Sequence, residues 1–221
     1  MLMIPFPWLS ILRTSCRIVS SSVRCAALLV LLYNSCANAG SFKRVSIDGN
    51  FDDWIGVPVA MDDDEDGEGN FDFKDVSIAN DEDFVYVRVR LHSPDDYASF
   101  HHQVVVDGDG DSFTGLSWLG LGSEMMIEDG VGYQQKNGAF NEGQVSQLAW
   151  ENAPIGAVDQ IELKFSRGTI DTDAENVFSS AKVVLSFVAR DLSWEITDTV
   201  EGIFYEIAET PERFEGTFTV G

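Results

Sequence analysis

The residues best suited to chemistry lie in one short acidic segment with the sequence DGDGD at residues 107–111. Three carboxylates spaced two residues apart, with glycines between them, can curl around one hard cation and share its charge, as calcium loops do. Carboxylates this close repel one another unless a positive group lies between them. We therefore predict a calcium site formed by Asp107, Asp109 and Asp111, with Glu124 or an acid of residues 62–66 completing it. The alternative is a solvated turn without an ion.

A second acidic run, DDDED, occupies residues 62–66 and belongs to a segment with eight acids between residues 62 and 75. Such a run is usually a solvated loop, because like charges repel and hydrate well. We predict that residues 62–75 form this kind of loop. A second ion site is the alternative.

Two tryptophans, Trp118 and Trp150, lie in glycine-rich or polar surroundings. Exposed indole rings can stack against the C–H faces of sugar rings, so these residues are predicted to bind a polysaccharide or a cell-envelope glycan. Burial in the core is the alternative for each. Trp54 differs, because it follows an Asp48–Asn50 turn signal and is predicted to enter the core, with a ligand role as its alternative.

The sequence contains no pattern typical of a catalytic centre. It has no Gly-x-Ser-x-Gly or His-Glu-x-x-His motif, and its abundant carboxylates make any pair of acids uninformative. His92, His101 and His102 lack metal-ligand spacing, and Met125 and Met126 fit hydrophobic packing better than ligation. We therefore predict that the protein is not an enzyme.

Short segments of alternating apolar residues must position these groups. They recur between Gly, Asp and Asn turns, the pattern of an antiparallel β protein, and no long helical segments separate them. The strands are expected near residues 42–47, 75–80, 84–91, 103–106, 124–127, 131–135, 161–165, 183–187, 203–207 and 217–220. The predicted fold is all-β, a two-sheet antiparallel sandwich of jelly-roll or immunoglobulin-like type with little helix.

Residues 1–39 have the features of a secretory signal peptide. They contain three arginines and no acid, then an apolar run at residues 25–32, and they end in Ala37-Asn38-Ala39. Cleavage after Ala39 leaves one domain of residues 40–221 without cysteine, secreted or in the periplasm or cell envelope, and without a membrane span. A membrane anchor and a lipoprotein formed through Cys36 are the alternatives.

The charge balance limits the partners. The chain has 14 Lys and Arg against 37 Asp and Glu, a formal net charge of −23, which argues against nucleic acid. Fifteen Phe and five Trp supply more apolar surface than a disordered chain of this charge would have.

Four segments together resemble the secreted bacterial proteins built on a family nine carbohydrate-binding-module-like sandwich, which is related to the DOMON superfamily. They are Ile47 to Trp54, Asn80 to Leu91, Val106 to Glu124, and Ile161 to Arg167, in the order that the family shows. The resemblance implies a noncatalytic β-sandwich, calcium near residues 107–111, and glycan binding.

The same resemblance keeps another class open, because some branches of the superfamily bind haem b. Under that alternative the chain is an electron-transfer domain, with Met125 or Met126 and His101 or His102 on the iron. A structural envelope protein whose acids hold cations is the third interpretation. The leading prediction is an exported, calcium-stabilised glycan-binding or adhesion-type module.

Overall fold

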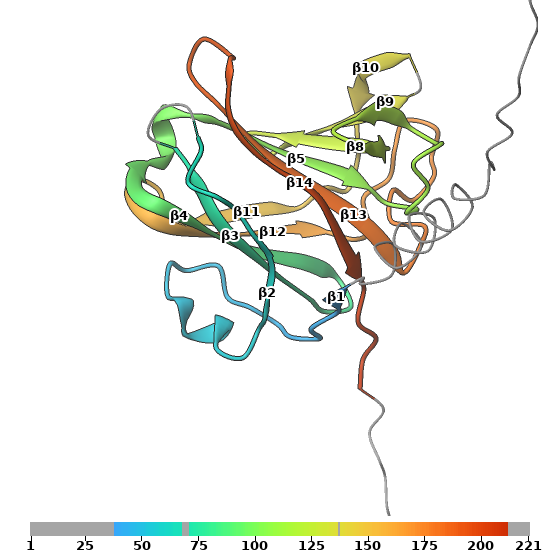
Figure 1. Ribbon diagram of the computed structural model, residues 1–221. Helices are drawn as coiled ribbons and strands as arrows, with labels where there is room; N and C mark the ends of the chain where they lie inside the picture. The colour runs from blue at the N-terminus through green and yellow to red at the C-terminus, as the bar shows by residue number, and fades with distance from the viewer. Residues whose placement is uncertain (1–37, 68–70, 137, 212–221) are drawn as a thin grey trace, which may run out of the picture. The chain divides into compact units, whose positions relative to one another are not determined.

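The computed structural model describes residues 38–67, 71–136 and 138–211. In that part of the chain two larger β-sheets face each other, and a third sheet has two strands (Figure 1). Its helical content is limited to two short 3₁₀ turns, η1 (Phe51–Trp54) and η2 (Tyr97–Ser99). The prediction of an all-β, two-sheet sandwich with little helix is confirmed.

The larger sheet has seven strands in the order β1-β14-β13-β5-β8-β9-β10. Neighbouring strands are antiparallel, except that β1 runs parallel to β14. The bounds are β1 (Asn38–Ala39), β5 (His101–Asp107), β8 (Met125–Glu128), β9 (Val131–Lys136), β10 (Ala139–Gln144), β13 (Lys182–Arg190) and β14 (Ile196–Glu206).

The second sheet has five antiparallel strands in the order β11-β12-β4-β3-β2. Their bounds are β2 (Val59–Asp62), β3 (Phe73–Asn80), β4 (Phe84–Asp96), β11 (Trp150–Ala153) and β12 (Ala157–Ser166). The two-stranded sheet is a hairpin of β6 (Leu116–Trp118) and β7 (Leu121–Ser123).

The core lies between the two large sheets, and strand alternation decides which side chains enter it. On β5, Val104 joins the main core cluster, whereas Val105 joins a second cluster. On β8, Met125 and Met126 divide between the same two clusters, and both are fully buried. The interpretation of these methionines as packing residues is confirmed.

The two further clusters explain why β3 and β13 are buried at nearly every position. Trp118 and Leu121 of the β6–β7 hairpin pack on the second cluster of the large sheet. Trp54 and Val57 pack with Tyr86 of β4 in the third cluster. Strands covered on both faces are apolar almost continuously.

A buried glutamate fastens the segment that carries Trp54. Glu162 of β12 is 0% exposed, and its Oε1 accepts hydrogen bonds from the backbone N–H groups of Asp48 (2.8 Å) and Gly49 (2.7 Å). Its Oε2 accepts a third from the indole N–H of Trp54, at 2.9 Å. Trp54 is 1% exposed, and Asp48 caps the turn by accepting from Asn50 N, as predicted.

Most predicted strands are present, and two expectations are wrong. Residues 43–47 are not a strand, because Val45 packs against the third cluster and the segment pairs only through an isolated bridge from Phe42 to Asn80. Residues 62–75 are not one loop, because β2 ends at Asp62 and β3 begins at Phe73. Asp75 is buried in β3, where it accepts a hydrogen bond from Arg90 Nε at 2.9 Å.

Several predictions fall at or beyond the limits of the described residues. The strand expected at 217–220 and most of the leader lie outside them. Asn38 and Ala39 pair with Tyr205 and Glu206, so cleavage after Ala39 would remove these two pairs. In the described ranges no helix has the length and apolar character that crossing a bilayer requires.

Candidate functional site

The acidic loop begins where β5 ends, at the buried Asp107. Gly108 lies directly against the Val177 carbonyl, where no Cβ could fit, and Gly110 has a φ of +70°, which favours glycine. Asp107 Oδ1 accepts from Gly110 N at 2.7 Å, and Asp109 Oδ1 accepts from Asp111 N at 2.8 Å. The glycines therefore allow the tight curl that the spacing predicts.

This curl brings three carboxylates together. Asp107, Asp109 and Glu124 each offer an oxygen within 4.8 Å of the other two. Glu124 lies between β7 and β8, and its Oε2 accepts a hydrogen bond from Gly108 N at 2.8 Å. The loop and the sheet thus contribute to one oxygen-rich cluster, which we call the loop site.

A threonine hydroxyl lies among these oxygens. Thr114 Oγ1 is 2.9 Å from Asp109 Oδ2, 3.1 Å from Glu124 Oε1 and 2.8 Å from the Asp111 carbonyl oxygen. A hydroxyl has one hydrogen and can satisfy only one of these acceptors. The Asp111 carbonyl also accepts from Thr114 N at 3.1 Å. Asp109 Oδ2 and Glu124 Oε1 therefore share at most one hydroxyl hydrogen, an arrangement that suits a hard cation.

The electrostatics of the loop site also favour a cation. Burial, together with the charges of Asp109 and Asp107, raises the pKa of Glu124 to about 7 against the opposing hydrogen bonds from Gly108 and Thr114. Burial likewise raises the pKa of Asp107 to about 6, with Asp109 adding to the effect and backbone hydrogen bonds opposing it. Among the described residues none of the three carboxylates forms an ion pair.

The structure thus brings together three of the four predicted calcium ligands. The carboxylate of Asp111 is not part of the group, because its side chain is exposed and accepts a hydrogen bond from Phe113 N at 3.0 Å. Only the Asp111 carbonyl faces the site, through Thr114. The two-residue spacing of the three aspartates could not show that the Asp111 carboxylate bonds to the backbone of its own loop.

The two predicted sugar-binding tryptophans lie in different places. Trp118 is partly buried over the second cluster, with its ring edge-on to Phe140 at 5.7 Å and the Arg190 guanidinium 5.9 Å from its centroid. Trp150, on β11, packs against the main core and donates a hydrogen bond to Asn152 Oδ1 at 3.0 Å. No contact joins the two indoles among those described.

Trp150 lines a hollow of ≈ 350 Å³, which we call the aromatic hollow. It lies where η2 and β5 meet the β8–β9 turn and β11, and its lining includes Tyr97, His101, His102, Asp129, Trp150 and Asn152. The His102 ring stacks on Tyr97 at 3.8 Å, and burial lowers the pKa of His102.

A further indole, that of Trp194, stacks on a residue that lines the aromatic hollow. Trp194 is 45% exposed and stacks on the His101 ring, with 3.7 Å between centroids. His101 Nδ1 is in turn 2.7 Å from Asp129 Oδ2. Neither Tyr97 nor Trp194 was predicted from the sequence as a site residue, although residues 97–102 include four aromatic or imidazole side chains that could have indicated the hollow.

The fold and the site define an acidic β-sandwich with an oxygen-rich loop site at one end of β5 and an aromatic hollow at the other. No protein-family model matches the chain, and no curated protein matches it. Solved structures of a family nine carbohydrate-binding module from Caldicellulosiruptor kristjanssonii are similar to it. One, in complex with cellotriose, has a TM-score of 0.45 at 13% identity and covers 83% of this chain and 98% of the module. Another, with glucose, has a TM-score of 0.44 at 12% identity and covers 81% and 98%.

Proposed function

We propose that this protein is an exported, noncatalytic module that binds a glycan in the aromatic hollow and is stabilised by calcium at the loop site. The observation that supports glycan binding is the composition of the hollow. Indole and phenol rings lie beside the polar groups of Asp129, Asn152 and His101. Sugars present both apolar C–H faces and hydroxyl groups, so they need both kinds of partner.

The rings of the aromatic hollow are held in place before any ligand arrives. The Trp150 indole is fixed by its hydrogen bond to Asn152, and Trp194 is fixed by stacking on His101. The backbone of Trp194 is held as well, because its carbonyl accepts from Arg190 Nη1 at 2.8 Å. Rigid aromatic side chains supply contact area at little entropic cost, which favours binding.

Calcium has a structural role in this proposal. β5 begins at His101, beside the aromatic hollow, and ends at Asp107, in the loop site. An ion at Asp107 therefore lies at the far end of the strand from the sugar. The loop site would fix the β5–β6 connection, and with it Trp118, whose predicted role as a glycan ligand remains a prediction.

Calorimetric titration tests glycan binding. The probes are glucose, cellotriose and a set of plant and algal polysaccharides, added to the protein of residues 40–221 in calcium. Trp194→Ala removes a half-exposed ring and is expected to weaken binding about tenfold, or about 1.4 kcal/mol. Phe113→Ala is the matched control, because Phe113 is 91% exposed in the acidic loop.

Two results would contradict the proposed glycan site. One is the absence of heat with every glycan. The other is equal affinity of Trp194→Ala and Phe113→Ala for a glycan that does bind, which would place the binding surface elsewhere, with Trp118 as the next residue to replace.

Thermal and denaturant unfolding with calcium and with chelator test the loop site. Extracellular calcium sites commonly bind at about 10⁻⁴ to 10⁻³ M, so millimolar calcium should raise the free energy of unfolding by about 1 kcal/mol. Asp109→Ala should lose this contribution of the loop site, so its calcium gain should be smaller than that of wild type, whereas Asp111→Ala should keep the full gain because that carboxylate lies outside the group. A calcium gain in Asp109→Ala equal to that of wild type would count against the loop site.

A further inference from the structure

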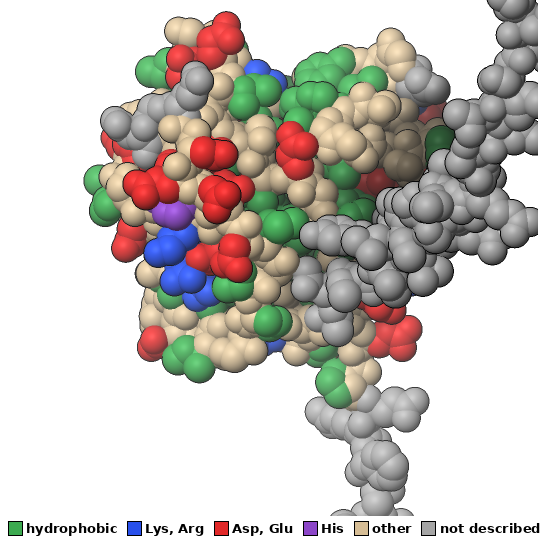
Figure 2. Space-filling model, viewed as in Figure 1, with side chains coloured by type: hydrophobic (Ala, Val, Ile, Leu, Met, Phe, Trp, Pro, Cys, Tyr) green, Lys and Arg blue, Asp and Glu red, His purple; other side chains and the backbone are tan. Residues whose placement is uncertain are grey.

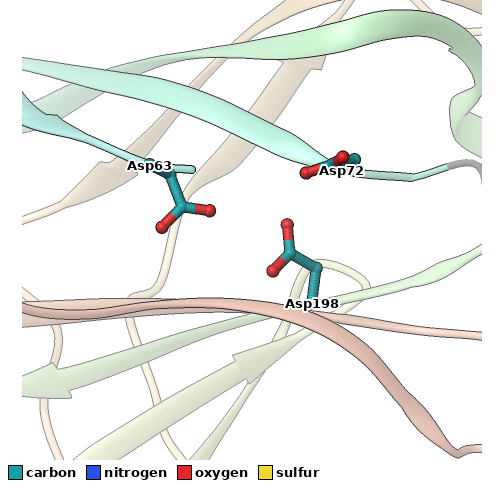
Figure 3. A group of neighbouring side chains, drawn as sticks. All are labelled: Asp63, Asp72 and Asp198. Atoms are coloured by element: carbon teal, nitrogen blue, oxygen red, sulfur yellow. The ribbon is translucent and has the colours of Figure 1, made fainter. Parts of the chain in front are cut away.

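A second group of three carboxylates lies between the two large sheets. Asp63 follows β2, Asp72 precedes β3, and Asp198 lies within β14 of the opposite sheet. Each offers an oxygen within 4.8 Å of the other two. Figure 3 shows Asp63 reaching down from one layer, Asp198 rising from the other, and Asp72 directing an oxygen into the space between them.

Two of these carboxylates have oxygens without any hydrogen-bond donor. Asp72 is 8% exposed, and its buried Oδ1 has no partner; Asp63 Oδ2 is likewise buried and unpartnered. Asp198 differs, because it is held by Phe73 N at 2.6 Å and Thr199 N at 2.7 Å. A buried, unsatisfied carboxylate oxygen is costly, so two of them aimed at a third carboxylate call for a cation.

The surrounding charges do not supply that cation. Burial is the main reason that the pKa of Asp63 is raised to about 7; the charges of Asp198, Asp66 and Asp72 contribute to this value, and His92 opposes it. None of the three carboxylates forms an ion pair in the described ranges. Figure 2 shows acidic side chains gathered on this face, beside a group of Lys and Arg side chains.

We propose that Asp63, Asp72 and Asp198 bind a calcium ion that joins the two sheets. The three side chains offer only oxygen, the ligand that calcium prefers, whereas a structural zinc site would normally use Cys or His. This inter-sheet site shares no residue with the loop site and does not depend on glycan binding. For residues 62–66, it corresponds to the second ion site that was the alternative to a solvated loop.

The inter-sheet site is connected to the aromatic hollow by one residue. Phe71 precedes Asp72, and its ring contacts those of His102 at 4.9 Å and Phe100 at 5.1 Å. Both of these side chains line the hollow. An ion on Asp72 therefore holds the residue that supports one wall of the hollow.

Calcium stoichiometry, measured by calorimetric titration with calcium alone, tests the proposal. The Asp109→Ala protein, in which the loop site is disabled, should bind one calcium ion per chain. Adding Asp72→Asn should abolish this binding. Adding Asp64→Asn instead should leave it intact, because Asp64 is an exposed acid of the same run and the substitution removes the same charge.

The variants are expected to fold, because Asp72→Asn is isosteric and removes a buried repulsion. In chelator it should melt at a higher temperature than wild type, and circular dichroism checks the fold. Asp198→Asn is the second variant if Asp72→Asn does not fold. The proposal is overturned if Asp109→Ala binds no calcium, or if Asp72→Asn or Asp198→Asn leaves its stoichiometry unchanged. If wild type and Asp109→Ala bind the same number of calcium ions and Asp72→Asn abolishes this binding, the result would support the inter-sheet site and contradict the loop site.

Discussion

Replacing Glu162 with glutamine should destabilise the protein strongly, although glutamine has nearly the same shape as glutamate. The carboxylate of Glu162 accepts three N–H donors, two from the backbone of residues 48 and 49 and one from Trp54. Glutamine has a single oxygen and an NH₂ group. If that oxygen serves the two backbone donors, the NH₂ group faces the indole N–H, and two donors meet in a site without water access.

The expected loss follows from these three contacts. A hydrogen bond to a charged group contributes roughly 1.5 to 3 kcal/mol, and a neutral one about 0.5 to 1.5. Glu162→Gln weakens two bonds by this difference and leaves the Trp54 donor buried and unpaired, which costs about 1 to 3 kcal/mol more. Together these contributions predict a loss of about 3 to 6 kcal/mol in the free energy of unfolding.

Urea unfolding of the wild type and four variants measures this loss and its cause. Glu151→Gln is the matched control, because Glu151 is an exposed residue paired with Lys164 and should cost less than about 1 kcal/mol. Trp54→Phe removes the indole donor, so Glu162→Gln should cost about 1 kcal/mol less in that background. A loss no larger than that of Glu151→Gln, or no coupling with Trp54, would refute the reasoning.

Three further predictions concern stability and processing. Asp81→Asn should cost about 1 to 2 kcal/mol at neutral pH. Burial raises the pKa of Asp81, but hydrogen bonds from Tyr86 and Arg44 outweigh this effect and lower the pKa overall. The stabilisation is therefore present above the unfolded pKa of about 3.9 and is lost as the pH falls through the folded pKa. Denaturant titrations at several pH values should show the stability difference between wild type and Asp81→Asn shrinking below about pH 4, and a constant difference would contradict the prediction. Trp118→Ala should lower the free energy of unfolding by about 3 kcal/mol, because the ring packs on buried side chains of the large sheet; unchanged stability with lost glycan binding would instead support its predicted ligand role. Mass analysis of the exported protein should find its N-terminus directly after Ala39, and a lipidated N-terminal cysteine would contradict this.

The strands that the sequence predicts well are those whose neighbours are close in the chain. Residues 84–91 and the pair formed by 124–127 and 131–135 alternate clearly and meet across short turns. Trp54 was likewise predictable, since a large indole beside a turn is normally buried. Residues 43–47 alternate as well, yet they form no strand and cover the outer face of a sheet. Alternation with a period of two shows which side chains are apolar, but it does not show which strand the segment would pair with.

The loop site was partly predictable for the same reason. Asp107 and Asp109 are separated by a glycine, so their convergence is local, and Glu124 follows between β7 and β8, of which β8 pairs with β5. The exclusion of the Asp111 carboxylate was not predictable, because it depends on one hydrogen bond within the loop.

By itself the sequence determined the fold class and the strongly acidic character of the chain, together with one curled acidic loop, because all of these depend on residue types and short-range spacing. Only the tertiary structure decided that Asp63 and Asp72 face Asp198, that Glu162 holds the turn of Trp54, and that Trp150 shares a hollow with Tyr97. The physical reason is that a polar side chain needs a specific partner only when it is buried. Its burial and its partners are set by elements far away in the chain, which pack against it as the two sheets come together.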